Sequence, residues 1–246
     1  ARELDAELVR VAPVSRWEEH PVQDPEFWPQ NIWPWARNVV VLGIPLFAPM
    51  VATTPSMVYQ EMYDTSNRML DDMAYRLSKL GYRAVWFPRD CYFSVDDLVL
   101  NPNAAFSHAV AAHYAGMGTI GASHNLLTRE FGPRVRMVSI ITDCPLEADP
   151  MLEEDLCTHC GLCLRKCPSQ CFSDTGNGLY DMDKAACSVH HVDLVAQHHW
   201  PCGTCIDVCP VGEDRRMSRG EPMLSPGGAE HCRAYGSDAG RSAEER

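Results

Sequence analysis

Ten of the chain's twelve cysteines lie between Cys144 and Cys209, and most of these fall into two closely spaced runs. The first run has the spacing C-x2-C-x2-C-x3-C-P and is formed by Cys157, Cys160, Cys163, Cys167 and Pro168. Three thiolates two residues apart can bind three irons of a cubane. The fourth cysteine, displaced by one residue and followed by proline, points toward a neighbouring cluster. The spacing therefore predicts one [4Fe–4S] cluster with a second beside it.

A second run follows and is formed by Cys202, Cys205, Cys209 and Pro210. In proteins with two such clusters, the last cysteine of each run binds the cluster of the other run. The ligands predicted for cluster I are Cys157, Cys160, Cys163 and Cys209. Those predicted for cluster II are Cys167, Cys202, Cys205 and one more. Cys187 is the preferred last ligand, and Cys171 is the alternative.

Zinc is the main competing interpretation, because zinc also takes sites made of four cysteines. Three cysteines at two-residue intervals ahead of a Cys-Pro pair are awkward for a tetrahedral ion. A disulfide framework gives no reason for the repeated Cys-Pro ending. The runs therefore favour iron–sulfur chemistry. The cysteines outside the clusters are expected to be ordinary buried or free thiols, namely Cys91, Cys144, Cys232 and, unless it is a ligand, Cys171.

The 246 residues include 33 acidic and 21 basic side chains, which give a formal net charge of −12. Nucleic-acid binding draws much of its affinity from Lys and Arg on phosphates, so no nucleic-acid partner is expected. No apolar run approaches the roughly 20 residues of a membrane helix. No signal peptide is visible. A cytoplasmic location is expected, with a processed exported protein as the alternative because the numbering opens on Ala1.

The segment before the cysteine runs alternates between strand and helix patterns. Strands are predicted at Asn38–Leu46, Tyr82–Pro88 and Arg134–Asp143, and helices at Met57–Leu80 and Phe106–Ala115. Residues 1–37 are expected to be an irregular entry whose tryptophans pack on the core. This alternation is typical of a layered domain. We predict an α/β (α+β) domain over 1–150, a two-cluster ferredoxin-like module over 151–213 and a polar tail over 214–246.

A glycine-rich turn, Ala115-Gly-Met-Gly-Thr-Ile-Gly121, follows the second predicted helix. The pattern G-x-G-x-x-G indicates dinucleotide binding only where it follows a strand and opens a helix. Here it follows a helix, which argues against that interpretation. Glycines at this density allow a backbone to lie flat against a large planar ligand.

From about residue 100 to 212, the sequence resembles the reductive dehalogenases and epoxyqueuosine reductases. The resemblance is carried by the glycine turn, the cysteine runs and three phrases between them: Asn125-Leu-Leu127, Phe131-Gly-Pro-Arg-Val-Arg136 and Thr142-Asp-Cys-Pro-Leu-Glu147. It implies a nitroreductase-like domain that holds cobalamin base-off, without a protein ligand to cobalt. Two [4Fe–4S] clusters would deliver the electrons. The resemblance also supports Cys187, which matches a second-cluster ligand of the epoxyqueuosine reductases.

The same resemblance implies the binding partners. It places the corrinoid beside Gly116, Met117, Gly118, Gly121 and Asn125. It implies a small-molecule substrate, and the Gly-Pro-Arg-Val-Arg phrase leans toward the dehalogenases and hence toward halogenated compounds. A low-potential donor such as ferredoxin or flavodoxin is the expected source of electrons.

The proton donor is open at this stage. Epoxyqueuosine reductases place an acid shortly before the glycine turn, but the matching position is near Pro102 and no carboxylate stands there. His108 and Tyr63 are the catalytic candidates, because imidazole and phenol groups can each supply a proton. Further candidates are Tyr59, Tyr92 and Tyr114.

Two functions therefore follow from the sequence. The leading prediction is a cobalamin-dependent iron–sulfur reductase, which makes the chain an oxidoreductase. The alternative, suggested by the missing acid, is a non-catalytic [4Fe–4S] electron-transfer protein or a corrinoid-reducing partner protein.

Overall fold

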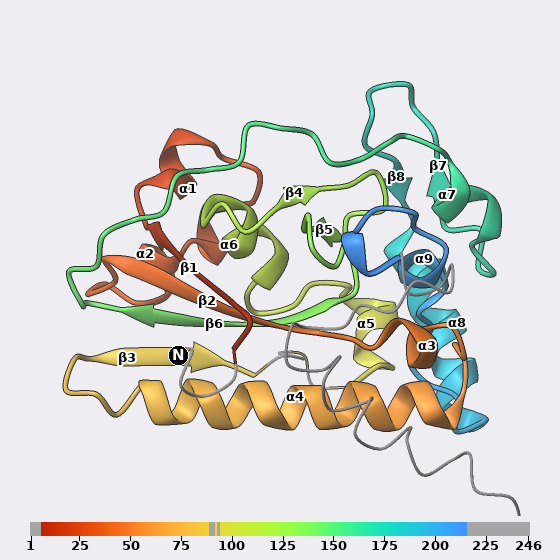
Figure 1. Cartoon of the computed structure of the whole chain (residues 1–246), viewed down its shortest axis with the longest axis horizontal. Coiled ribbons are helices and arrows are strands. Elements are labelled where there is room, and N and C mark those ends of the chain that lie inside the picture. The colour runs from red at the N-terminus through yellow and green to blue at the C-terminus, as the bar shows by residue number, and fades with distance from the viewer. Residues whose placement is uncertain (1–5, 89–91, 93, 216–246) are drawn as a thin grey trace, which may run out of the picture.

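The computed structural model describes residues 6–88, 92 and 94–215 (Figure 1). Its strands are β1 Leu8–Pro13, β2 Asn38–Pro45, β3 Ala84–Phe87, β4 Thr119–Ile120, β5 Leu126–Leu127, β6 Val135–Thr142, β7 Phe172–Ser173 and β8 Asp181–Met182. Its helices are α1 Arg16–Glu19, the 3-10 helix η2 Pro25–Phe27, α2 Pro29–Ile32, α3 Ala48–Val51, α4 Met57–Leu77, α5 Asp97–Leu100, α6 His108–Tyr114, α7 Leu162–Lys166, α8 Lys184–Ala196 and α9 Thr204–Asp207. Cys91, Cys232 and all of the predicted tail except Asp214 and Arg215 lie outside the described residues.

The main sheet has four strands in the order β1-β2-β6-β3, and every neighbouring pair is antiparallel. All eight residues of β6 are buried, as its apolar sequence predicts for a central strand. The three predicted strands and two predicted helices are all present, each within a few residues of its predicted ends. The fold is therefore mixed α/β, as the alternating patterns indicate.

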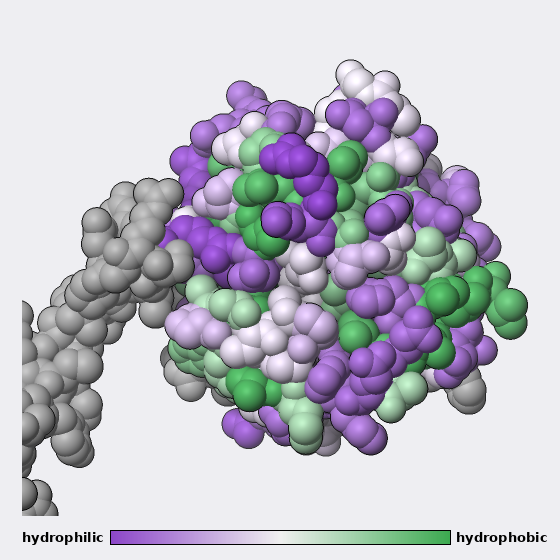
Figure 2. Space-filling view, turned by 90° about the vertical axis from the view of Figure 1, so that its right-hand side faces the viewer, coloured by the Kyte–Doolittle hydropathy of each residue, from purple (hydrophilic) through white to green (hydrophobic). Residues whose placement is uncertain are grey.

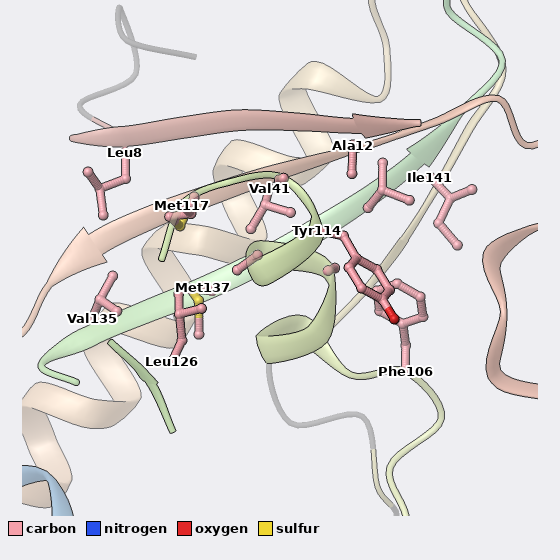
Figure 3. Close-up of a cluster of buried hydrophobic side chains, with 14 of the residues drawn as sticks. Leu8, Ala12, Val41, Phe106, Tyr114, Met117, Leu126, Val135, Met137 and Ile141 are labelled. Carbon is pink, nitrogen blue, oxygen red and sulfur yellow. The ribbon is translucent and has the colours of Figure 1, made fainter. Parts of the chain in front are cut away.

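Side chains alternate between the two faces of the sheet, because successive residues of a strand point to opposite sides. On one face, Val41 and Met137 join a cluster with α6 and the β4–β5 hairpin (Figure 3). On the other face, Leu42, Val138 and Ile140 pack against α4. The sheet is thus covered on both sides, and β6 reaches both layers.

Helix α4 begins where Ser56 accepts a hydrogen bond from the Tyr59 backbone amide, a regular N-cap. The helix ends at Leu77, three residues earlier than predicted, and Gly81 follows with a left-handed φ of 97°. Met62 and Met73 are buried against the core, whereas Met69 is exposed.

The entry segment contains a strand that the sequence pattern did not predict. β1 pairs with β2 along its whole length and forms an edge of the sheet. Trp17 is almost completely buried against Phe106 and Tyr114, and Trp28 and Trp33 pack on the same cluster. The expectation that these tryptophans pack on the core is confirmed for all three. Trp35 instead is exposed beneath the Arg83 guanidinium.

The cysteine runs lie at one end of the molecule, with α7, α8 and α9 (Figure 1). Helix α7 packs against α9, and α8 packs against α5, which comes before the cysteine runs in the chain. Among the described residues, no helix is long and apolar enough to cross a membrane.

Candidate functional site

Four cysteines from both runs line one small cavity at the surface of the α7–α9 end: Cys157, Cys160, Cys163 and Cys209. Gly161, in a left-handed conformation with φ 70°, turns the chain between Cys160 and the start of α7. The wall behind the cysteines is the end of the glycine turn, including Gly121 and Ala122. We name this cavity site I. It contains the four residues that the crossing rule assigns to cluster I.

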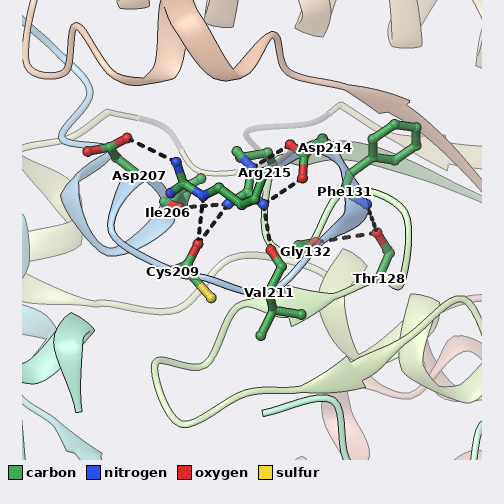
Figure 4. Close-up of polar contacts among 10 residues, drawn as sticks. Thr128, Phe131, Gly132, Ile206, Asp207, Cys209, Val211, Asp214 and Arg215 are labelled. Carbon is green, nitrogen blue, oxygen red and sulfur yellow. Dashed lines mark hydrogen bonds and ion pairs between the residues drawn. The ribbon is translucent and has the colours of Figure 1, made fainter. Parts of the chain in front are cut away.

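Cys209 is held in site I by two arginines (Figure 4). Arg134 Nη1 donates to the Cys209 carbonyl at 3.1 Å, and Arg215 Nε donates to the same oxygen at 2.9 Å. Arg134 also donates to the carbonyls of Ile206 and Val211. A guanidinium offers five donors in a fixed fork, so it can hold several carbonyls of one loop at once.

The Arg134 charge is balanced inside the protein. Arg134 has no exposed surface, and its side chain forms a bidentate ion pair with the buried Asp214 at 2.5 and 2.7 Å. A buried charge is tolerated when it is paired and hydrogen-bonded. This clamp joins β6 directly to the loop that carries Cys209. The predicted boundary between module and tail, at 213/214, therefore falls within a packed segment.

The other cysteines gather deeper, around the start of α9 and the first turn of α8. The charges that act on Cys187 come from Cys171, Cys205, Cys202 and Cys167. Burial is the main cause that raises the pKa of Cys187 and raises that of Cys205 to about 12. We name this group, Cys167, Cys187, Cys202 and Cys205, site II.

Cys171 also touches this group. Its side chain is buried, and its sulfur lies 3.5 Å from the sulfur of Cys167. Both Cys202 and Cys205 act on the pKa of Cys187, which favours it as the fourth member.

A cleft of about 360 Å³ opens between the α/β domain and site II. Its lining comes from η2, the segment 102–109, residues 124–126, the first residues of β6, and from Tyr92, Lys184 and Ile206. This volume is typical of a ligand site. No carboxylate is among the described residues that line the cleft. Pro102, where the resemblance placed an acid, is on its wall.

Asn125 connects the cleft to site II. It lines the cleft, and its Nδ2 donates to the Cys205 sulfur at 3.5 Å. Ile206, the residue after Cys205, lines the cleft as well. Site II and the cleft therefore share a wall.

The two catalytic candidates have different positions. His108 lines the cleft, with Nδ1 3.0 Å from Ser139 Oγ and Nε2 3.2 Å from the Pro88 carbonyl. Tyr63 lies under the Arg136 guanidinium, 3.6 Å from its ring centroid, and packs edge-on against Trp200. Tyr63 is not among the cleft-lining residues, but Arg136 is. Of the further tyrosines, Tyr92 lines the cleft and Tyr114 is buried beside Trp17.

The glycine turn packs against protein rather than against the cleft. A methyl group at Gly116 would lie 1.9 Å from the Pro150 carbonyl oxygen, and one at Gly118 would lie 2.0 Å from that of Leu127. Met117 is part of the core cluster. Close backbone packing alone accounts for these glycines. Of the five residues predicted to contact a cofactor, only Asn125 lines the cleft, and the role of the other four stays a prediction.

Sequence reasoning missed several site residues. Arg134 and Asp214 are 80 positions apart, so no local pattern joins them. Lys184 and His124 line the cleft without belonging to a chemical motif. Arg134 and Arg136 both belong to the Gly-Pro-Arg-Val-Arg phrase, and this phrase was the only sequence feature that could have pointed to them as site residues. Arg134, the residue before β6, reaches site I, while Arg136, within the strand, hydrogen-bonds to Asn67 of α4.

Sequence comparison finds relatives in both groups that the motifs resemble. The tetrachloroethene reductive dehalogenase of Sulfurospirillum multivorans is 24% identical over 191 residues, 71% of this chain and 35% of that protein. The epoxyqueuosine reductase of Leadbetterella byssophila is 31% identical over 111 residues, 40% of this chain and 35% of that protein. The chain spans about a third of the length of the curated relatives it matches. No protein-family model matches it.

Solved structures give the same two groups. The catabolic reductive dehalogenase NpRdhA matches with a TM-score of 0.59 at 20% identity, covering 87% of this chain and 32% of that one. The epoxyqueuosine reductase from Streptococcus thermophilus matches with a TM-score of 0.52 at 15% identity, covering 85% and 63%. A similar epoxyqueuosine reductase is bound to a modified tRNA stem loop. The resemblance is therefore confirmed, and the chain shares the mixed α/β fold of these proteins.

Proposed function

We propose that this chain is a cobalamin-dependent iron–sulfur reductase that acts on a small molecule, with halogenated compounds as the first class to test. The observation that carries the proposal is the shared wall of site II and the cleft. Asn125 contacts both the cleft and Cys205, and Ile206 continues the same wall. A cluster in site II would therefore lie behind the wall formed by Asn125 and Ile206.

Two [4Fe–4S] clusters fit the donor sets. Site I presents four cysteines around one cavity, and site II gathers Cys187 with Cys167, Cys202 and Cys205. Thiolates are the usual ligands of such clusters. Burial raises the pKa of several of these thiols, including Cys209, so their protons must leave when iron binds. We assign cluster I to site I and cluster II to site II.

The cleft is the proposed corrinoid and substrate site, in a nitroreductase-like domain over residues 1–150. The structure of one similar reductive dehalogenase suggests a mechanism for B12-dependent dehalogenation. When bound, a corrinoid held base-off would supply a strongly reducing cobalt centre. Asn125, Lys184 and Arg136 would offer hydrogen bonds to its polar groups or to an anionic substrate. The two-cluster module, 151–213, would feed electrons to it.

Of the two proton-donor candidates, we favour His108 because it lines the cleft. With Ser139 Oγ donating to Nδ1, the proton sits on Nε2 and is held by the Pro88 carbonyl. Transfer to a substrate would require this 3.2 Å bond to be exchanged for one into the cleft. Tyr63 is screened by Arg136 and would need a larger rearrangement.

A ferredoxin or flavodoxin is the proposed electron donor. The end of the molecule that carries the cysteines is mostly polar, with hydrophobic residues in scattered groups (Figure 2). Such a face suits a transient redox partner better than a permanent one. Because the net charge is −12, we propose no nucleic-acid partner. We also propose a cytoplasmic location, with a processed exported form as the alternative.

A non-catalytic electron carrier, or a corrinoid-reducing partner protein, is the second candidate. The lack of a carboxylate among the described cleft residues favours it. Such a protein would need both clusters but no substrate chemistry.

Iron and cobalt analysis after anaerobic reconstitution with cobalamin tests the proposal. Two cubanes and one corrinoid predict about eight irons and one cobalt per chain. Reductive loss of halide from a panel of haloaromatic and haloalkene compounds would then support the enzyme. Eight irons without cobalt would contradict the corrinoid mechanism and favour the carrier. Zinc in place of iron would contradict both.

A further inference from the structure

The turn between α3 and α4 is fastened to the loop that carries the ligands of site II. Thr54 Oγ1 accepts a hydrogen bond of 2.7 Å from the Gly203 backbone amide, and Gly203 lies between Cys202 and Cys205. Tyr59, in the first turn of α4, packs directly on the same glycine. The α/β domain therefore contacts the loop of site II through Thr54 and Tyr59 as well as through Asn125.

The hydroxyl of Tyr59 is in an unusual situation. The residue is 0% exposed, and its Oη finds no hydrogen-bond partner among the described residues. Leaving a buried hydroxyl without a partner costs about 1–3 kcal/mol. The surrounding residues, Met62, Tyr63 and Trp200 among them, are mainly apolar or aromatic. A tyrosine is retained at a place where phenylalanine would bury the same ring without that cost.

The position of the hydroxyl points to its partner. A methyl group added at Gly203 would lie 2.7 Å from Tyr59 Oη, so the oxygen lies against the Cys202–Cys205 loop. Cys202 and Cys205 are close enough for their charge to act on it. Burial is the main cause that raises the pKa of Tyr59, against the opposing influence of Arg136. A phenol hydroxyl placed beside a cluster sulfur can donate a hydrogen bond to it.

We propose that Tyr59 Oη donates a hydrogen bond to a sulfur of the cluster in site II, either a cysteine thiolate or a bridging sulfide. The inference rests on the proposed cluster II. Hydrogen bonds to cluster sulfurs are one of the factors that set the reduction potential. A donor stabilises the reduced cluster more, since that state carries one more negative charge. Tyr59 is thus a positioning residue that raises the potential of cluster II.

The test compares Tyr59→Phe with Tyr114→Phe, a matched loss of a buried hydroxyl beside Trp17 on the far side of the sheet. Both variants and the wild type are reconstituted, and each cluster is titrated anaerobically with EPR detection. Tyr59→Phe is expected to keep all the iron of the wild type and to lower the potential of cluster II only. Tyr114→Phe is expected to leave both potentials unchanged. An unchanged cluster II potential in Tyr59→Phe, or a shift of cluster I, would overturn the inference.

Denaturant unfolding of the cluster-free protein shows whether Tyr59→Phe acts through the stability of the fold instead of through the cluster. Because the hydroxyl has no hydrogen-bond partner within the described part of the chain, Tyr59→Phe should unfold at the same or a higher denaturant concentration than the wild type. A clear loss of stability would show that the hydroxyl has a partner within the protein, and the inference would be wrong. The iron content of the wild type distinguishes a failure of the Tyr59 inference from a failure of the proposed function. Two clusters with no Tyr59 effect overturn this inference alone, whereas a wild type without clusters overturns the proposed function too.

Discussion

The two cysteine sites differ in what surrounds them. Site I lies at the surface, with Cys160 exposed, and is backed by charged side chains, above all Arg134 and Asp214. At site II, the buried Tyr59 packs on the Cys202–Cys205 loop, and Asn125 forms a wall that the site shares with the cleft. This difference suggests a direction for electron transfer through the two clusters. We propose that electrons enter at cluster I from a partner protein and leave from cluster II toward the cleft.

The largest expected effect comes from removing one ligand at each site. Cys157→Ala should abolish cluster I and keep cluster II, and Cys205→Ala should do the reverse. Either variant should fall from about eight irons per chain to about four, because each site holds its own cubane. Iron analysis with EPR checks this. If either variant lost all its iron, the two sites would not be independent.

Breaking the clamp of site I should have the next largest effect. Arg134→Met leaves Asp214 buried without its partner, so the free energy of unfolding should fall by about 3–5 kcal/mol. Cluster I should also lose iron faster than cluster II, because the Cys209 carbonyl loses a donor. Denaturation and timed iron release measure the two effects.

The control for the clamp is Arg76→Met, which removes an exposed ion pair with Asp72 on α4. Exposed pairs contribute less than about 1 kcal/mol. Equal losses in Arg76→Met and Arg134→Met would contradict the role assigned to burial. Loss of cluster II rather than cluster I in Arg134→Met would contradict the placement of the clamp.

Two single variants can decide which cysteine, Cys187 or Cys171, is the fourth ligand of cluster II. Cys187→Ala should lose cluster II, since Cys187 has both Cys202 and Cys205 in its surroundings. Cys171→Ala should keep both clusters and lose only some packing around a buried thiol. The opposite pattern of iron content would make Cys171 the ligand.

The smallest predicted effect concerns Asn125. Asn125→Ala removes the hydrogen bond to the Cys205 sulfur. A hydrogen bond contributes about 1 kcal/mol, which for a one-electron couple corresponds to about 40 mV. The reduction potential of cluster II should therefore fall by up to that amount. Asn103→Ala is the matched control, because Asn103 lines the cleft and its side-chain amide donates to Asn101 instead. A similar shift in both variants would indicate a general effect of the cleft.

Much of this arrangement could be predicted from local sequence. The apolar run of β6, the helical spacing of α4 and the cysteine intervals each reflect a period that neighbouring residues alone determine. β1 was missed because its six residues lie in a segment dense in proline and tryptophan, and an edge strand is recognised chiefly by its pairing with β2. The glycine turn was correctly found, but its packing on Pro150 and Leu127 depends on tertiary structure. The same is true of the pairing of Arg134 with Asp214.

The central claim is that cluster II, and not cluster I, faces a corrinoid in the cleft. EPR of bound cobalt(II) cobalamin beside a reduced cluster tests it most directly, because a paramagnet close by broadens the cobalt signal and speeds its relaxation. The broadening should persist in Cys157→Ala, which keeps cluster II, and vanish in Cys205→Ala. Broadening that vanishes in Cys157→Ala and persists in Cys205→Ala would contradict the account, as would a protein with both clusters that binds no cobalamin.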